Sequence, residues 1–183
     1  MTSFRLAPMS SMIRGLTLIL LAIPLAFFAA ALVGTSRLVG PAVLVVVIYS
    51  WVWLRFRPTV FVVRQDVLEV IWPFKRRQIE RVNIAGVRTI DNMELRREVG
   101  WCVRMGAGGL WGGFGWLWTQ RRGIVQMYLS RTNDLVWIEF TNGRPWLITP
   151  EHPEAFVRAL SSESYAVAQQ SIPGDVPASR GRP

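Results

Sequence analysis

The side chains that most often perform catalysis are scarce in this chain. Its 183 residues include one histidine, one cysteine and one lysine, namely His152, Cys102 and Lys75. A nucleophilic triad needs a Ser or Cys within reach of a histidine base, whereas His152 stands in a predicted first helical turn, where a solvated or capping role is favoured. Cys102 lies between Trp101 and Val103 and is predicted to be a small core residue. We therefore predict no catalytic residues and no enzymatic activity.

Metal and cofactor sites are also not expected. Asp91, Glu94 and Glu98 have a spacing that would place them on one side of a helix, but we predict that segment 91–98 is a solvated charged loop. A zinc site needs several converging His, Cys or carboxylate ligands, and no such spacing is present. The glycine-rich run 106–116 departs from the dinucleotide pattern because Trp111 occupies the position of the last glycine, and the Gly-Lys-Ser/Thr ending of a P-loop is missing.

The large aromatic residues of this glycine-rich run allow three interpretations. Glycines interleaved with large rings favour a bulged, curved strand whose backbone approaches its neighbours closely. The same rings could instead insert into a membrane interface or form a partner surface. We favour the curved strand and keep the other two open. The candidate interface aromatics are Trp111, Phe114, Trp116 and Trp118 in or directly after this run, together with Trp51 and Trp53 at the end of the second apolar run.

Two groups of basic residues could contact a phosphate group. Both lie at predicted turns or strand ends, and an arginine side chain binds phosphate oxygens in a bidentate manner. Exposed turns also carry charge when they bind nothing, so a purely solvated role stays open. The two groups are Lys75, Arg76, Arg77 and Arg81, and then Arg121 and Arg122.

Two apolar runs near the N-terminus decide where these residues act. Segments 15–34 and 38–54 contain no Asp, Glu, Lys, Arg or His and are separated by three residues. About 17 to 20 apolar residues cross a bilayer as a helix, so we predict a transmembrane helical hairpin. A cleaved signal peptide is the competing interpretation of the first run, although the run is longer than the usual apolar core of such a peptide.

The placement of arginines predicts the orientation of this hairpin. Arg5, Arg14, Arg55 and Arg57 flank its terminal side, and Arg37 alone lies in the connecting turn. Positive charge concentrates on the cytoplasmic side of membrane proteins, so both termini are predicted to be cytoplasmic at the plasma membrane. The net charge of +9 fits this topology and attraction to anionic lipid. A nucleic-acid partner is not expected, because the sequence contains no recognisable nucleic-acid-binding motif.

Strand-like patterns dominate the rest of the chain. Asn142-Gly143 is the strongest hairpin signal, because a type I′ turn needs positive φ at both central residues. Thr149 and Pro150 are predicted to begin a helix whose apolar stripe contains Phe156, Val157 and Leu160. Beyond residue 168 we predict a disordered tail, 169–183. The predicted strands are 59–63, 67–72, 76–82, 87–90, 101–105, 124–130, 135–141 and 146–148.

Segments 106–116, 123–128 and 148–157 together resemble the pattern of bacterial PH-like (pleckstrin-homology-like) domains. The resemblance covers about residues 58 to 165 and combines a Gly-aromatic strand with a Thr-Pro-Glu helix start. It implies an α+β protein in which a hairpin segment, 1–57, precedes a PH-like domain, 58–168. The resemblance also implies that this domain is a mainly antiparallel split β-barrel capped by a C-terminal helix. It brings no catalytic residues.

The expected function is therefore that of a membrane-anchored binding module. The PH-like domain would present its surface to anionic lipid head groups or to a protein or peptide partner. The alternative is an accessory or scaffold subunit of a membrane protein complex that has no lipid-specific role.

Overall fold

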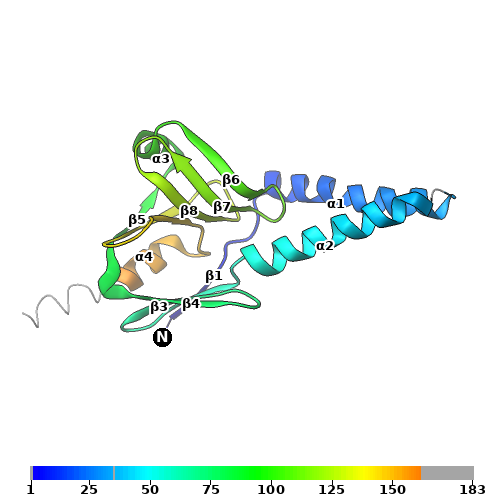
Figure 1. Cartoon of the computed structure of the whole chain (residues 1–183). Coiled ribbons are helices and arrows are strands. Elements are labelled where there is room, and N and C mark those ends of the chain that lie inside the picture. The colour runs from blue at the N-terminus through cyan, green and yellow to red at the C-terminus, as the bar shows by residue number, and fades with distance from the viewer. Residues whose placement is uncertain (1, 35, 162–183) are drawn as a thin grey trace, which may run out of the picture.

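The computed structural model describes residues 2–34 and 36–161. Helices α1 (Ser11–Leu32) and α2 (Val39–Phe56) form an antiparallel pair that projects from a domain of two sheets (Figure 1). A short 3-10 turn, η1 (Ser36–Leu38), connects them. Both helices are long and apolar enough to cross a membrane. The predicted helical hairpin is present, and the predicted tail, 169–183, lies outside the described residues.

A proline within α1 explains one contact that joins the two helices. Pro24 has no N–H, so the carbonyl of Leu20 loses its partner within the helix. The hydroxyl of Tyr49 in α2 donates a hydrogen bond to this carbonyl at 3.1 Å. A polar group of the apolar hairpin is thereby satisfied, which is the condition under which membrane helices tolerate proline.

The first sheet contains four antiparallel strands in the order β1-β2-β3-β4. The strands are β1 (Thr2–Arg5), β2 (Val60–Val63), β3 (Val67–Ile71) and β4 (Arg76–Glu80). The predicted strands 59–63, 67–72 and 76–82 correspond to β2, β3 and β4, whereas β1 was not expected. Because β1 precedes the helices and pairs with β2 after them, the helical hairpin is an insertion between two neighbouring strands.

The second sheet has the order β5-β9-β10-β8-β7-β6. Its pairs are antiparallel except that β10 runs parallel to β8. The hairpin predicted at Asn142-Gly143 exists, but its turn is not type I′, because only Gly143 has a positive φ and the connection covers 141–145. The strands are β5 (Ile84–Ile90), β6 (Cys102–Gly108), β7 (Gly113–Thr119), β8 (Gly123–Leu129), β9 (Leu135–Phe140) and β10 (Trp146–Ile148).

Two short helices complete the domain, and both correct a prediction. Segment 91–98 is not a loop, because α3 (Asn92–Val99) occupies it and the carboxylate of Asp91 accepts a hydrogen bond from the backbone N–H of Glu94. The C-terminal helix α4 (Pro153–Ser161) starts later than predicted. Thr149 does not cap it, because the buried Thr149 hydroxyl accepts a hydrogen bond from Ser130 N at 2.9 Å.

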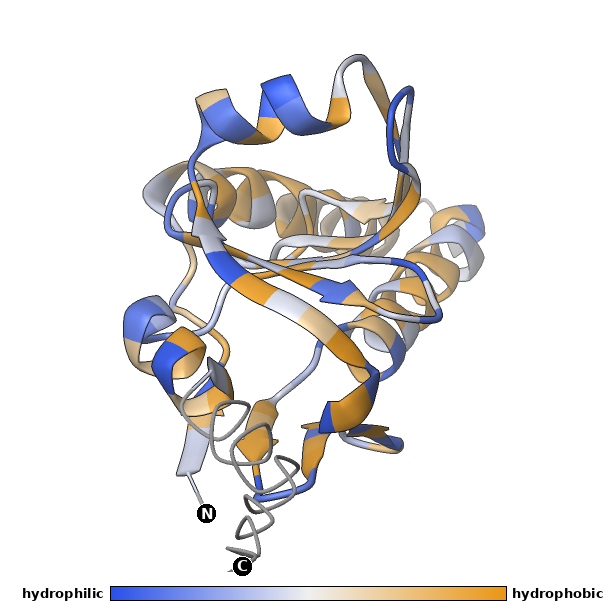
Figure 2. Ribbon diagram, turned by 90° about the vertical axis from the view of Figure 1, so that its left-hand side faces the viewer, coloured by the Kyte–Doolittle hydropathy of each residue, from blue (hydrophilic) through white to orange (hydrophobic). Residues whose placement is uncertain are grey.

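The six-stranded sheet carries apolar residues on both faces. One face packs on the four-stranded sheet and α4, around Phe61, Phe114, Trp146 and Phe156. The other face lies under α3, on the side away from the four-stranded sheet (Figures 1 and 2). Phe156 and Leu160 are buried as the predicted helix stripe required. The expected α+β architecture is confirmed: two N-terminal apolar helices, then antiparallel sheets and a C-terminal helix.

Candidate binding surfaces

The loop between β6 and β7 binds the helical hairpin directly. The backbone N–H of Trp111 donates to the hydroxyl of Thr17 in α1 at 3.0 Å, and Trp111 makes an edge-on ring contact with Trp53 of α2 at 4.7 Å. Gly109 has a φ of +91°, and a Cβ there would lie 2.8 Å from a side-chain carbon of Leu16. The domain is therefore fixed against both helices.

The aromatic candidates serve different roles in the structure. Phe114 is fully buried in the core, and Trp111 packs on the hairpin. Trp116 and Trp118 are 43% and 58% exposed on the sheet. Trp51 is exposed on α2, where it faces the surroundings of the hairpin. No single one of the three interpretations fits all of these residues.

The glycines of this run produce the close backbone approach that the sequence predicted. Gly106 and Gly115 are paired across β6 and β7 with φ values of 135° and 131°. A Cβ on Gly106 would lie 2.3 Å from the carbonyl oxygen of Phe114, and one on Gly115 would lie 2.4 Å from that of Met105. Neither backbone has room for a side chain, so both positions require glycine. The register of β6 and β7 is unbroken, so the bulge expected in this run is absent.

The first basic group is divided between the surface and the framework. Lys75 and Arg76 are exposed at the start of β4, and the guanidinium of Arg77 lies 5.0 Å from the ring centroid of Trp146. Arg81 instead donates to backbone carbonyls, including those of Gln65 and Ala159. It thus joins the β2–β3 turn to the end of α4, which is a structural role.

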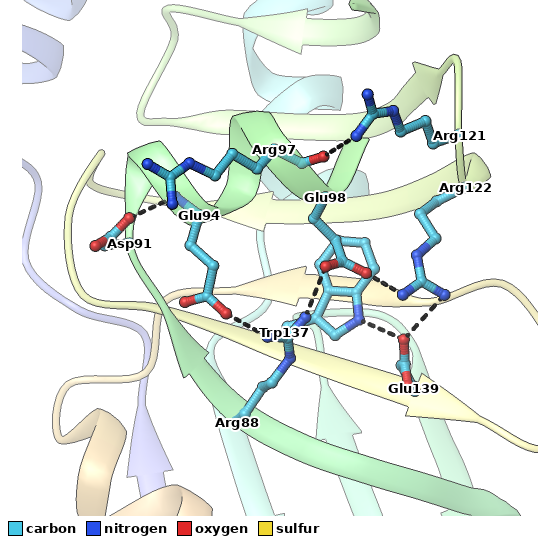
Figure 3. Close-up of polar contacts among 9 residues, drawn as sticks. All are labelled: Arg88, Asp91, Glu94, Arg97, Glu98, Arg121, Arg122, Trp137 and Glu139. Carbon is cyan, nitrogen blue, oxygen red and sulfur yellow. Dashed lines mark hydrogen bonds and ion pairs between the residues drawn. The ribbon is translucent and has the colours of Figure 1, made fainter. Parts of the chain in front are cut away.

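The second basic group lies at the β7–β8 turn, beside α3 and away from the first group. Arg121 donates to the carbonyl of Arg97 at 2.7 Å, and Arg122 pairs with Glu98 and Glu139 (Figure 3). These contacts hold α3 on the sheet. The structure therefore does not bring the six basic candidates together in one phosphate site.

Glu98 stands at the centre of this ion network. It also pairs with Arg88 at 3.2 Å, and Arg88 pairs in addition with Glu94 (Figure 3). The hydrogen bond from Arg122 lowers the pKa of the Glu98 carboxyl, and Arg88 adds to the effect. The network was missed at the sequence level because it depends on α3, which was expected to be a loop.

A groove of about 700 Å³ separates β4 from the six-stranded sheet. Beside it Tyr128 packs edge-on against Trp146, and burial raises the pKa of Tyr128 to about 12. The groove is lined by Arg77, Gln78, Ile79, Glu80, Asn83, Gln126, Phe140, Asn142, Gly143, Arg144 and Trp146.

A second, smaller cavity of about 360 Å³ lies between α1, α2 and Trp111.

The residues considered for catalysis do not converge. Cys102 is exposed on the edge strand β6, so its predicted core position is wrong. His152 is exposed just before α4, and its carbonyl accepts a hydrogen bond from Phe156 N. Within residues 2–34 and 36–161, no group of three or more His, Cys, Asp or Glu side chains could hold a metal ion.

The sequence profile of the bacterial PH domain matches residues 59–164. The chain belongs to the bacterial PH domain family. Comparisons with curated proteins and with solved structures gave no match. The matched PH domain begins one residue before β2, yet β1, which precedes the match, completes the sheet of the PH domain. The groove and both basic groups lie within the PH domain, whereas Thr17 and Trp53 lie outside it.

Proposed function

We propose that this chain is a two-pass membrane protein that holds its PH domain against the inner membrane surface as a binding module. The observation that carries the proposal is the contact of the β6–β7 loop with Thr17 and Trp53. A domain on a free tether would need no such contact. Leu32 and Trp51 on the hairpin are 89% and 63% exposed, and a bilayer would cover side chains of this kind.

The orientation follows from the charges at the two ends of the hairpin. Arg14, Arg55 and Arg57 lie at the end that joins the PH domain, and Arg37 lies at the opposite end. The excess of arginine beside the PH domain favours a cytoplasmic domain with both termini inside. Trp53 lies at the same end, and the guanidinium of Arg57 stacks on it at 4.3 Å. This pair suits the head-group region, where amphipathic rings and cations settle.

The β3–β4 turn is the part of the PH domain best placed to contact lipid. Val60, four residues after the end of α2, pairs with Ile71, and Ile71 pairs with Arg76, so this turn lies at the hairpin end of the sheet. At its tip Phe74 is 81% exposed, and Lys75 follows it. An exposed ring beside cations matches an anionic membrane surface, where each basic residue contributes about 1 kcal/mol.

The only cysteine of the sequence provides a test of topology. Cys102 is exposed in β6, so a membrane-impermeant maleimide should label it in inside-out vesicles and not in intact cells. Cys102→Ser is the control for background labelling. Labelling in intact cells would place the PH domain outside and contradict the proposed orientation.

Lipid contact is tested with a nitroxide label attached at position 74 in the double variant Cys102→Ser, Phe74→Cys. In bilayers that contain phosphatidylglycerol, the label should be more accessible to oxygen and less accessible to a water-soluble nickel reagent than in pure phosphatidylcholine. Adding Lys75→Glu and Arg76→Glu should remove this difference, whereas Arg121→Glu, in the β7–β8 turn of the six-stranded sheet, should not. Equal accessibility in both bilayers would favour the scaffold subunit over the lipid-contacting module.

A further inference from the structure

We propose that the groove beside β4 binds an extended acidic segment of a partner protein, which adds to β4 as a fifth strand. This inference rests on the proposed function and deepens it by naming the kind of partner. Membrane anchoring itself enters the argument at one step only, where a second copy of this chain is excluded as the occupant of the groove. Three features of the groove support it, namely a free strand edge, an adjacent apolar face and an excess of unpaired cations.

The first feature is the free edge of β4. Within the described part of the chain β4 pairs only with β3. Trp72 N donates to Lys75 O and Arg81 N donates to Asp66 O, so Lys75 and Arg81 direct their backbone groups to the β3 side. Because this direction alternates along an antiparallel strand, the N–H and C=O groups of Arg76, Gln78 and Glu80 point away from β3. Gln78 and Glu80 also line the groove.

The second feature is an exposed apolar face beyond the floor of the groove. Gln126 lines the groove and lies directly opposite Trp116 in β7, and Trp118 lies opposite Ile124. Trp116 and Trp118 follow Phe114 at two-residue steps and therefore point to the face that packs on the four-stranded sheet. Here the four-stranded sheet does not cover them. The exposed set is Val103, Met105, Trp116, Trp118 and Ile124.

The third feature is the charge of the groove. Arg77 and Arg144 both line it, and among the described residues no carboxylate lies within ion-pair distance of either guanidinium. Of the described residues that line the groove, Glu80 is the only acid, and its carboxylate is 3.4 Å from the side-chain amide of Asn83. The side chain of Arg77 points toward the six-stranded sheet, since it is opposite Val70 and lies over Trp146. Carboxylates on that side of an added segment would pair with the two arginines, and apolar side chains at its other positions on the same side would cover the exposed face. Strand addition of this kind combines main-chain hydrogen bonds with side-chain selectivity.

A second copy of this chain does not fit the groove edge to edge. Two copies of β4 can pair in one sheet only in antiparallel fashion about a two-fold axis perpendicular to the strands. Figure 1 shows β3 and β4 running along the direction of the α1–α2 hairpin. The second hairpin would then point in the opposite direction, and the two could not enter one membrane. The occupant we infer is therefore a different polypeptide.

The test uses the full-length protein in phosphatidylcholine nanodiscs and a fluorescent, terminally capped peptide of three Glu-Val repeats. We expect a rise in anisotropy on binding, together with slower amide exchange across residues 76–80. Arg77→Glu with Arg144→Glu should weaken binding at least tenfold. Arg96→Glu with Arg97→Glu, at two exposed positions of α3 remote from the groove, should change it less than twofold. A Lys-Val peptide should bind at least tenfold more weakly than the Glu-Val peptide.

The backbone contribution is tested with Gln78→Pro. Proline is tolerated in an edge strand where the lost N–H points outward, so this variant should keep its thermal unfolding midpoint and lose peptide binding. If the variant unfolds, a Glu-Val peptide N-methylated on alternate residues removes the same main-chain hydrogen bonds on the peptide and should not bind.

The proposal is overturned if neither Gln78→Pro nor N-methylation weakens binding, if no Glu-Val binding occurs at millimolar concentration, or if the Lys-Val peptide binds equally. It is also overturned if phosphatidylglycerol vesicles, without peptide, give the same arginine-dependent protection of residues 76–80. Repeating the assay in detergent separates failure of the peptide site from failure of membrane anchoring.

Discussion

Removal of one hydroxyl group should loosen the contact between the β6–β7 loop and α1. The change is Thr17→Val, which keeps the shape of a side chain that is only 4% exposed. The Thr17 oxygen accepts the N–H of Trp111 at 3.0 Å and lies 3.0 Å from the carbonyl of Gly109. Valine would leave the N–H of Trp111 without a partner at a contact that is partly buried.

The expected magnitude follows from the cost of an unsatisfied buried donor. That cost is about 1–3 kcal/mol, which corresponds to roughly a 5- to 140-fold shift in an opening equilibrium. Hydrogen exchange of the loop 109–112, measured by mass spectrometry on full-length protein in detergent micelles, should accelerate by a factor in this range. The ring contact between Trp53 and Trp111 remains, so the loop should open more often without the domain unfolding.

Two control variants make this reasoning refutable. Thr17→Ser keeps the hydroxyl and should retain most of the protection of the loop. Thr141→Val makes the same chemical change at an exposed position in the β9–β10 connection and should leave exchange of 109–112 unaltered. Protection in Thr17→Val equal to that of the natural sequence, or equal loss in the valine and serine variants, would show that the hydroxyl does not hold the loop.

Three further outcomes are expected in the PH domain. Gly106→Ala should lower the free energy of unfolding by at least about 2 kcal/mol, because its Cβ would lie 2.3 Å from the backbone oxygen of Phe114. Gly108→Ala should be tolerated, because the atom nearest to its Cβ would be 3.8 Å away. Chemical denaturation in detergent compares the two variants. The pKa of Glu98 is lowered in the folded state, so its ionised carboxylate stabilises the fold above the ordinary pKa of a glutamate, and this stabilisation is lost as the pH falls through the lower pKa of the folded state. Glu98→Gln should therefore reduce the loss of unfolding free energy at acid pH, whereas the same change at the exposed Glu151 should not. Burial raises the pKa of Tyr128 to about 12, so tyrosinate absorbance should show a step at high pH that Tyr128→Phe removes. The stability due to the neutral phenol should be lost as the pH rises from about 10 to 12. A tyrosine titration finished by pH 11 would contradict the burial of this side chain.

Strand and hairpin positions were largely predictable because local pattern determines them. The strands around β3 alternate or run apolar between clear turn residues, and the two helices of the hairpin are set by long apolar runs. The short helix α3 could not be predicted in this way, since its eight residues are mostly polar. Arg88 in β5 and Arg122 in the β7–β8 turn hold this helix in place through ion pairs with Glu98.

The sequence indicated which types of residue could form the candidate surfaces, but not which residues lie next to one another in the fold. Trp111 was selected for its aromatic ring, whereas the structure shows its backbone N–H bonded to Thr17, a polar residue within a predicted span that carries no sequence signal of its own. Arg81 matched its basic neighbours in type, yet carbonyls of two remote segments bind it. The groove was not expected, because it forms where β4 approaches β8, β9 and β10 and no single segment contains it.

The position of β1 changes how the anchor and the PH domain depend on each other. Phe4 in β1 lies opposite Phe61 in β2 and packs edge-on against Phe156 at 5.2 Å, so the core of the PH domain contains a residue from before the first helix. A fragment that starts at residue 58 matches the family region but leaves one edge of β2 bare and the place of Phe4 empty.

Loss of a buried phenylalanine side chain costs about 3–5 kcal/mol, which is a large part of the stability of a domain of this size. We therefore expect the fragment 58–183 to unfold at a clearly lower denaturant concentration than the full chain. Adding a peptide of residues 1–9 in trans should restore stability as its concentration rises, whereas the same peptide with Phe4→Ala should not. A fragment as stable as the full chain, with no response to the peptide, would show that β1 is dispensable and that the helical hairpin is only an attachment to a complete domain.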